Sequence, residues 1–307
     1  MRVLIVGAGG VGGYFGARLA RAGVPVTLLA RGAHLAAIQR EGLRVRSAVE
    51  GESVATVTAV ADVTGLPPAD AVLFCVKSFD TETAAAAIRA VIGPGTAVVS
   101  LQNGVDNEET LARVLGPGHA VGGVAYVFAA IESPGVIAHR FAGHVVFGEL
   151  DGRPSPRLEA LRAAFTQAGV RAEVSPDIRR TLWQKYVMIT AQAGMTALSR
   201  APIGVIRAVP ESRQMYRRIA EELTALAAAS GVDLGPDAVE GVMKAADGLA
   251  PEAYSSLHHD LTQGRRLELE TLHGHAVRLG ERLGVPTPTT FAVYATLKPH
   301  LDGRPPR

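Results

Sequence analysis

A glycine-rich turn near the start of the chain constrains the fold more than any other feature of the sequence. The apolar run at residues 3–6 reads as a strand buried on both faces, and a helical segment and a second strand at residues 26–29 follow it. Between the first strand and the helix, residues 7–12 read Gly-Ala-Gly-Gly-Val-Gly and match Gly-x-Gly-x-x-Gly. In this context the motif predicts a dinucleotide-binding unit whose helix N-terminus offers free N–H groups to phosphates.

Each glycine of the motif has a physical reason. Gly7 permits the tight turn, Gly9 lets the backbone approach a pyrophosphate, and Gly12 lets the helix pack closely on the strand. We expect the cofactor-binding glycines to be Gly7, Gly9, Gly10 and Gly12. The alternative is a glycine-rich turn that binds nothing, and the agreement of motif, context and spacing argues against it.

The end of the second strand indicates which dinucleotide is bound. An NAD site usually has Asp or Glu there to accept from the ribose 2′-OH, whereas this chain has Ala30 and then Arg31. A guanidinium forms bidentate pairs with phosphate, so Arg31 predicts NADP(H) over NAD(H). A solvated arginine at a strand end is the alternative interpretation of this residue.

Composition sets the broad class. A chain of 307 residues with 48% hydrophobic residues is long enough for two domains with cores of their own. The net charge of +2 requires neither a nucleic acid nor an acidic membrane as partner. Cys75 is the one cysteine, so no intrachain disulfide forms, and no stretch is apolar enough to span a membrane. We therefore expect a cytoplasmic enzyme.

The pattern of elements divides the chain near residue 175. Strands and helices alternate up to residue 174, which predicts a parallel, doubly wound sheet of the Rossmann type, and nearly everything beyond reads as helix. The expected domains are residues 1–175, which bind NADP, and residues 176–307, which supply substrate binding and catalysis. Within them we expect a hairpin of residues 43–49 and 53–60, turns at 133–135 and 142–143, and one helix over 255–284.

Polar residues follow the buried strands where a doubly wound sheet binds ligands. Lys77 comes after an apolar strand, and Asn103 comes after the next strand along the chain. Taken alone, Lys77 could be a solvated lysine at a strand end, and Asn103 could simply form an Asn-Gly turn. Because ligands bind beyond the carboxyl ends of strands, we expect both residues near a nicotinamide ring and its substrate.

The helical half offers a candidate proton donor. Lys185 lies on a helix whose following residues, 187–198, contain no other ionisable side chain, so the helix is mostly buried and a lysine there needs a partner or a cleft. Desolvation lowers the pKa of such a lysine and suits it to proton transfer. Further on, Glu268 and Glu270 do not share a helical face, so one faces a cleft while the other is solvated.

Together these residues resemble the ketopantoate reductases (2-dehydropantoate 2-reductases), within the 6-phosphogluconate-dehydrogenase-like group. The resemblance covers nearly the whole chain and implies a Rossmann-type sheet followed by an all-helical C-terminal domain. Its marks are the glycine turn, Arg31-Gly32, Val76-Lys77, Leu101-Gln102-Asn103-Gly104, Trp183-x-Lys185, Ser255-Ser256 with Asp260, and Glu268.

The resemblance implies an activity and roles for single residues. NADPH would give hydride to the C2 carbonyl of a 2-oxo acid, with 2-dehydropantoate reduced to (R)-pantoate in pantothenate and coenzyme A synthesis. Lys185 matches the general acid, which also stabilises the developing oxyanion, and Glu268 matches a glutamate that holds cofactor and catalytic geometry. Asn103 and Lys77 match positions near the nicotinamide and substrate, and Ser256 matches a serine that binds the substrate carboxylate.

One departure affects the substrate. The family usually has asparagines four and eight residues after the lysine, where this chain has Ile189 and Ala193. Gln192 and Thr196 lie near the same helical face and are candidates to replace the two amides. A more apolar pocket favours a less polar or bulkier substrate, because unpaired polar groups of the substrate lower affinity.

Other functions stay open at this point. The nearest is reduction of a different 2-oxo acid or ketone, and the most distant is a nucleotide sensor without turnover, which would need neither Lys185 nor Glu268. The pairs His258-His259 and His273-x-His275 do not put two ligands on one helical face, so we expect no metal. The alanine- and leucine-rich helices fit either a core or the face of a homodimer.

Overall fold

The computed structural model describes residues 1–304 of the chain. Contacts between Cα atoms divide it into two compact units: Met1–Gln102 with Asp106–Thr181, and Asn103–Val105 with the chain from Leu182 onward. The dividing point falls inside helix α6 (Ile178–Ser199), which begins just after the boundary expected at residue 175. Within residues 1–304, no helix combines the length and apolar character that crossing a membrane requires.

The first unit is built on one large sheet with a Rossmann-type centre. Its parallel strands follow the order β5-β2-β1-β6-β7-β8, so the chain starts in the middle and winds outward in both directions. The doubly wound fold class expected from the sequence is confirmed. These strands are β1 (Val3–Val6), β2 (Val26–Leu29), β5 (Thr58–Val60), β6 (Ala69–Phe74), β7 (Ile92–Ser100) and β8 (Ala120–Ser133).

Four more strands extend the sheet beyond β8 and make it mixed. Strand β9 (Val136–Gly148) runs antiparallel to β8, while β3 (Leu43–Ser47) and β10 (Ala172–Val174) both run parallel to β9. The turn expected at residues 142–143 is wrong, because β9 continues through it. Gly143, at φ +136°, is instead the extra residue of a bulge, since Ala142 pairs with Val127 and His144 with Tyr126.

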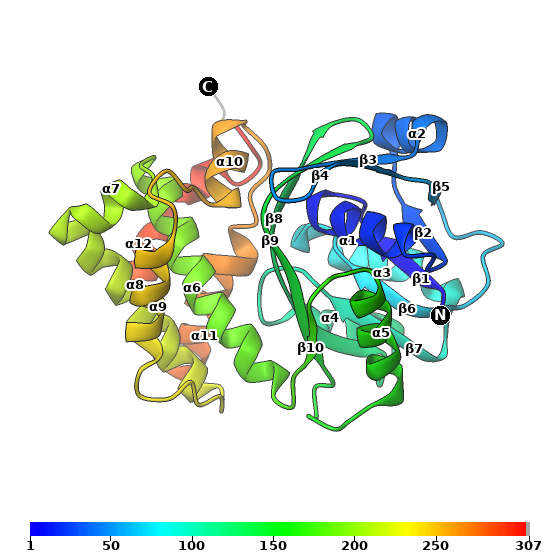
Figure 1. Ribbon diagram of the computed structural model, residues 1–307. Helices are drawn as coiled ribbons and strands as arrows, with labels where there is room; N and C mark the ends of the chain where they lie inside the picture. The colour runs from blue at the N-terminus through cyan, green and yellow to red at the C-terminus, as the bar shows by residue number, and fades with distance from the viewer. Residues whose placement is uncertain (305–307) are drawn as a thin grey trace. The chain divides into compact units, whose positions relative to one another are not determined.

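The expected hairpin is half right. Strands β3 and β4 (Gly51–Ala55) pair antiparallel around Glu50, but residues 58–60 form the separate strand β5 against β2. Strands β4 and β5 lie at opposite edges of the sheet, although only two residues separate them. Because two residues span less than about 11 Å, the sheet must curl, and Figure 1 shows β3 and β4 passing close to α1 (Gly10–Arg21).

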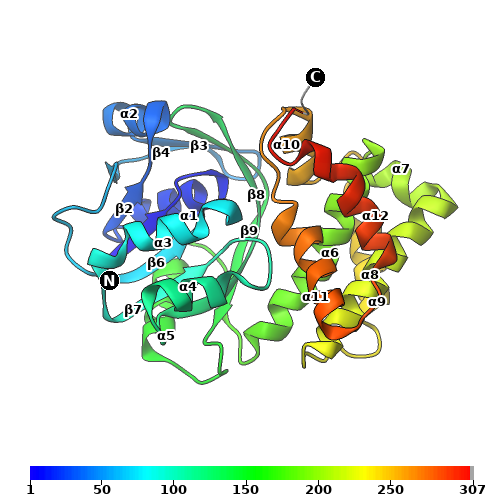
Figure 2. The same cartoon turned by 180° about the vertical axis from the view of Figure 1, so that it is seen from behind.

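Helices cover both faces of the sheet. All four residues of β1 are buried although alternate side chains point to opposite faces, so both faces must be covered. Val3 and Ile5 point into a core shared with α1 and α5 (Pro156–Gln167), while Leu4 and Val6 point into a second core. That second core contains side chains of α3 (Thr81–Ala87) and α4 (Asn107–Leu115), the helices nearer the viewer in Figure 2. The remaining short elements are α2 (Gly32–Glu41), η1 (Ser78–Asp80) and η2 (Arg89–Val91).

The second unit is helical, as expected from the sequence, and α6 contributes side chains to its core. Tyr186 and Ala191 of α6 belong to the same core as Ile219 and Leu223 of α8. The helices beyond α6 are α7 (Ile203–Ala208), α8 (Pro210–Ala229), α9 (Ala238–Gly248), α10 (Ser256–Thr262), α11 (His275–Leu283) and α12 (Pro288–Leu297), with η3 (Glu270–Gly274) and η4 (Lys298–His300).

The single helix expected over residues 255–284 is wrong. Helix α10 ends at Thr262, and Gly264 adopts φ +63°, which lets the Arg265 N–H bond back to the Asp260 carbonyl at 2.9 Å. The chain then runs without regular structure until η3, a π-helical turn in which the Gly274 N–H bonds to the Leu269 carbonyl. Glu268 therefore lies in a turn rather than on a regular helix.

Candidate active site

The glycine turn has the geometry that the sequence predicted. It joins β1 to α1, and Gly7 has φ +94°, a conformation that favours glycine. A Cβ on Gly12 would lie 2.2 Å from the Gly7 carbonyl oxygen, so only glycine lets the helix approach the turn. Gly10 is fixed by packing as well, because its Cβ would lie 1.9 Å from the carbonyl oxygen of Ala129 in β8.

The space outside the turn fits a dinucleotide phosphate. Gly9 is the N-cap of α1, no side chain caps this end of the helix, and a Cβ on Gly9 would meet no atom within 4 Å. The open space at Gly9 therefore lies at the N-terminus of α1, the positive end of its helix dipole. Phosphate binding by Gly7, Gly9 and Gly12 stays a prediction with which this geometry agrees.

His34 holds this turn in place, a role that the sequence did not indicate. Its Nε2 lies 2.8 Å from the Ala8 carbonyl oxygen, and its Nδ1 accepts from the Gly135 N–H at 2.9 Å. The neutral ring with its proton on Nε2 makes both bonds, and burial keeps the pKa of His34 below its usual value. The partners are 26 and 101 residues away, so no local pattern could have pointed to them.

Arg31 lies at the end of β2 as expected and points into solvent. Its side chain is 87% exposed, and Nη2 lies 3.0 Å from the Asp80 Oδ2 atom. Asp80 is a residue that the sequence reading missed. It comes three residues after Lys77, at the end of η1 in the segment that follows β6, so the rule that ligands bind beyond strand ends could have found it.

Lys77 begins the turn that follows β6, and Gln102 fixes that turn. The Gln102 Nε2 donates to the Val76 carbonyl at 3.1 Å and to the Thr81 Oγ1 at 2.8 Å. The buried Gln102 amide thereby ties the end of β7 to the segment that carries Lys77. Asn103, the next residue along the chain, groups with the second unit by its contacts.

In the second unit, Lys185 and Glu268 are electrostatically coupled. Burial lowers the pKa of Lys185 to about 8, and the charge of Glu268 partly opposes that shift. Glu268 is only 8% exposed. The Tyr186 hydroxyl, next to Lys185 on α6, donates to the Leu272 carbonyl at 2.5 Å and so holds the turn after Glu268 against α6.

Glu270 has a different environment from Glu268, although it is paired with other side chains rather than simply solvated. Its carboxylate accepts from Arg278, Lys298 and the Tyr294 hydroxyl, which together lower its pKa against the effect of burial. Glu270 is therefore committed to a network of charged groups between η3 and α12. Glu268 is the glutamate that faces the lysine.

Further along α6, Gln192 and Thr196, the two candidates to replace the family's asparagines, have different contacts. Ile189 and Gln192 are half-buried, and Ala193 is buried. The Thr196 hydroxyl lies 2.7 Å from the Ser255 Oγ and donates to the Gln192 carbonyl, so it connects α6 to the start of α10. Its donor is therefore already used, which favours Gln192 as the replacement for an amide.

The two serines at the start of α10 have separate roles. Ser255 is the N-cap, because its Oγ accepts from the His258 N–H at 3.1 Å. Ser256 is the first residue of the helix, and its side chain is exposed. The structure thus assigns the capping role to Ser255 and leaves Ser256 as the serine predicted to bind a carboxylate.

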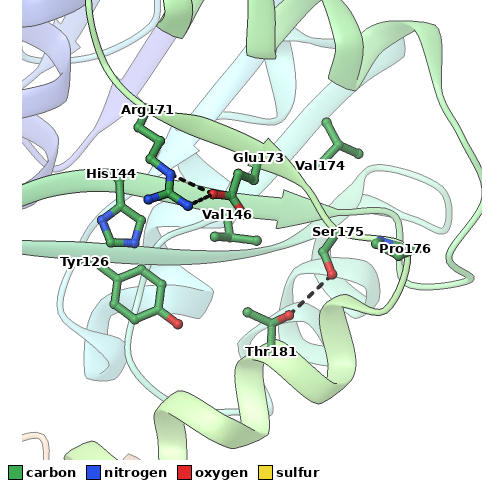
Figure 3. A pocket seen from close by; sticks show the side chains of 9 residues that line it. All are labelled: Tyr126, His144, Val146, Arg171, Glu173, Val174, Ser175, Pro176 and Thr181. Atoms are coloured by element: carbon green, nitrogen blue, oxygen red, sulfur yellow. Dashed lines mark hydrogen bonds and ion pairs between the residues drawn. The ribbon is translucent and has the colours of Figure 1, made fainter. Parts of the chain in front are cut away.

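A shallow pocket of about 350 Å³ in the first unit contains none of the predicted residues. Figure 3 shows the Tyr126 and His144 rings stacked, with centroids 4.5 Å apart, beside the Arg171–Glu173 ion pair and a Ser175–Thr181 hydroxyl contact. The charges of Arg171 and Glu173 balance each other. This pocket has no nucleophile beside a base and is not our candidate for the active site.

Comparison with known proteins identifies the family. Residues 3–152 match the domain described as ketopantoate reductase PanE/ApbA, and residues 177–300 match its C-terminal domain. The chain belongs to the ketopantoate reductase family. This is an oxidoreductase family, and the resemblance seen in the sequence is confirmed.

Three similar proteins illustrate the match. The 2-dehydropantoate 2-reductase of Archaeoglobus fulgidus is 35% identical over 284 residues, which cover 92% of each chain. The crystal structure of a PanE/ApbA family ketopantoate reductase from Ralstonia eutropha is 36% identical, with a TM-score of 0.90 over 98% of each chain. A D-mandelate dehydrogenase bound to NADH and anilino(oxo)acetate has the same fold at 22% identity, with a TM-score of 0.89 over 98% of each chain.

Proposed function

We propose that this protein reduces the keto group of a 2-oxo acid with NADPH, and that 2-dehydropantoate, which gives (R)-pantoate, is its substrate. Membership of the ketopantoate reductase family supports the reaction class. The observation that carries the proposal is the pair of half-buried Lys185 and buried Glu268, in which desolvation lowers the pKa of the lysine to about 8. Such an ammonium is protonated at neutral pH and releases its proton readily.

A bound nicotinamide would supply the hydride, and the residues of the chain supply the rest. The glycine turn and the N-terminus of α1 would hold the pyrophosphate, and Arg31 would hold the 2′-phosphate that distinguishes NADPH from NADH. Lys77 and Asn103 are the residues we expect beside the nicotinamide. Arg31 is exposed and the space at Gly9 is open, which suits both roles.

Lys185 would complete the reduction at the carbonyl oxygen. As C2 accepts hydride, negative charge grows on that oxygen, and the Lys185 ammonium first stabilises the charge and then transfers its proton, giving a hydroxyl group and a neutral amine. Glu268, buried beside the lysine, favours the protonated ammonium before the reaction. Ser256, Asn103 and Gln192 are the proposed contacts of the substrate's polar groups.

A second candidate is a less polar 2-oxo acid or a ketone. Ile189 and Ala193 provide no amide groups on α6, and the Thr196 hydroxyl is bonded to Ser255 and to the Gln192 carbonyl. A substrate with fewer polar groups would leave fewer of them unpaired. A sensor without turnover is the weakest candidate, because it gives no reason for a half-buried lysine with a lowered pKa beside a buried glutamate.

The experiment that tests the proposal is the loss of NADPH absorbance with 2-dehydropantoate, beside NADH and a panel of other 2-oxo acids. We expect turnover that prefers NADPH. Turnover of a bulkier oxo acid without 2-dehydropantoate activity would support the second candidate. NADPH binding without turnover of any member of the panel would contradict reductase function and favour the sensor.

We also propose that the protein works in the cytoplasm. Its single cysteine, Cys75, forms no intrachain disulfide, which suits a reducing compartment. A homodimer through the helical unit stays a prediction, which the mass of the protein in solution would test.

A further inference from the structure

Arg31 forms an ion pair with a carboxylate that lies outside the position used to predict NAD or NADP specificity from sequence. The usual sequence rule looks for an acidic residue at the end of β2, where a carboxylate accepts from the ribose of NAD(H). Here that position holds Arg31, and the carboxylate comes from Asp80, at the end of η1 and after β6. The guanidinium and the carboxylate lie 3.0 Å apart.

The Asp80 carboxylate pairs with Arg31 instead of capping the helix that follows it. It is the N-cap residue of α3, where an aspartate normally accepts from the backbone N–H groups of the first turn. The Asp80 side chain makes no such bond. Its carboxylate is directed to Arg31 and is 35% exposed, so it can still accept from a ligand.

The backbone around Asp80 is held firmly. Its N–H donates to the Lys77 carbonyl at 2.9 Å, and the Thr81 Oγ1 donates to the Ser78 carbonyl at 2.8 Å. Gln102 anchors Thr81 in turn. The carboxylate is therefore presented from a fixed turn, whereas Arg31 extends from the start of α2 on a flexible side chain.

The ion pair lies at the cofactor-binding end of the sheet. Strand β1 lies between β2 and β6, and the residues after these strands carry Arg31 and Asp80. The pair thus joins segments on either side of the strand that leads into the glycine turn. This is where the adenosine ribose of a dinucleotide is recognised in such folds.

We propose that Asp80 determines cofactor specificity together with Arg31 and allows the site to accept NADH as well as NADPH. This inference rests on the proposed function. With NADH, the Asp80 carboxylate accepts from the ribose hydroxyls, while Arg31 stays paired with it. With NADPH, the 2′-phosphate competes with Asp80 for the same guanidinium donors and meets the carboxylate's negative charge. Asp80 therefore limits the preference for NADPH that Arg31 creates.

The test uses two cofactor fragments that differ by the 2′-phosphate, 2′,5′-ADP and ADP, with affinities measured by calorimetry on the full chain. Asp80→Asn should tighten 2′,5′-ADP and weaken ADP, so that the ratio of the two affinities shifts toward 2′,5′-ADP by about tenfold. Arg31→Ala should shift the ratio the other way by a similar factor. Neither measurement depends on turnover or on the identity of the oxo acid.

The matched control is Glu82→Gln, two residues further on. It removes the same charge from the same region, but Glu82 pairs with Arg113 at 2.9 Å and not with Arg31. The control should leave the ratio within about twofold of the wild-type value, since exposed charges are screened. An unchanged ratio in Asp80→Asn, or an equal shift in Glu82→Gln, would overturn the role of Asp80. Failure of both fragments to bind the wild-type protein would instead overturn the cofactor site and the proposed function with it.

Discussion

At the scale of single residues, the glycine turn shows which residue roles can be predicted from the sequence alone. The roles of Gly7 and Gly12 follow from a local motif, and the structure has the positive φ and the close approach that the motif implies. The packing role of Gly10 depends on Ala129, and that of His34 on Gly135, each more than a hundred residues away. Local patterns carry no information about such distant partners.

Two alanine substitutions in the turn should separate folding from cofactor binding. Gly9→Ala places a methyl group in open space at an ordinary φ of −73°, so the protein should keep its melting temperature and lose affinity for NADPH by tenfold or more. Gly12→Ala puts the same methyl group 2.2 Å from a carbonyl oxygen and should lower the free energy of unfolding by about 3 kcal/mol. Thermal unfolding and NADPH titration of both variants check this, and equal stability of the two would contradict it.

At the scale of elements, η3 brings a histidine into the core of the second unit. His273 is fully buried, and neither ring nitrogen has a hydrogen bond of normal geometry. Its ring lies against Gly194 of α6, where a Cβ would come within 2.5 Å of the Nε2 atom. Burial lowers the pKa of His273 to about 4, and the Thr190 backbone only weakly opposes the shift.

This histidine should make the protein sensitive to acid. Its pKa is lower in the folded state than in the unfolded chain, so the unfolded chain binds the proton first as pH falls below about 6.5. Stability should then fall by about 3 kcal/mol between pH 6.5 and pH 4 from this residue alone. In His273→Leu that part of the pH dependence should vanish in denaturant unfolding at both pH values. The same loss in wild type and variant would show that His273 is not responsible.

Helix α6 determines the substrate in our account. Restoring the family's two amides with Ile189→Asn and Ala193→Asn should raise kcat/KM for 2-dehydropantoate, relative to an apolar 2-oxo acid, by about tenfold, because polar groups of the substrate regain partners. The ratio of the kcat/KM values for the two substrates also controls for damage to the fold, because such damage would lower both values. A ratio that does not change in a variant with normal thermal stability would contradict the role of these positions.

The broken helix after α10 shows where sequence patterns mislead at this scale. Residues 255–284 have helical composition throughout, but Gly264 turns the chain and the π-helical turn shifts the periodicity beyond it. The sequence indicated different environments for Glu268 and Glu270, but for the wrong reason, because the two do not share a helix and Glu270 is ion-paired rather than simply solvated. It could not show that Glu270 meets Arg278 and Lys298, because those contacts depend on how η3 and α12 pack.

At the scale of the whole molecule, the order of buried strands and helices was enough to predict a doubly wound sheet followed by helices. The additional strands were harder to place, since β3 and β10 both pair with β9, far from either in the chain. The residues proposed for the pyrophosphate and the 2′-phosphate belong to the first unit, and the proposed proton donor and its glutamate to the second. The central claim is that Lys185 is that donor.

The pH dependence of kcat/KM, measured with NADPH and the fastest 2-oxo acid, tests this claim most directly. A general acid works in its protonated form, so the rate should fall about tenfold per pH unit above the Lys185 pKa of about 8. Glu108, whose pKa burial raises to about 8, could titrate in the same range, so Glu108→Gln is the control and should keep the fall. A rate that stays constant to pH 9.5, or a fall that disappears in Glu108→Gln, would contradict proton donation by Lys185.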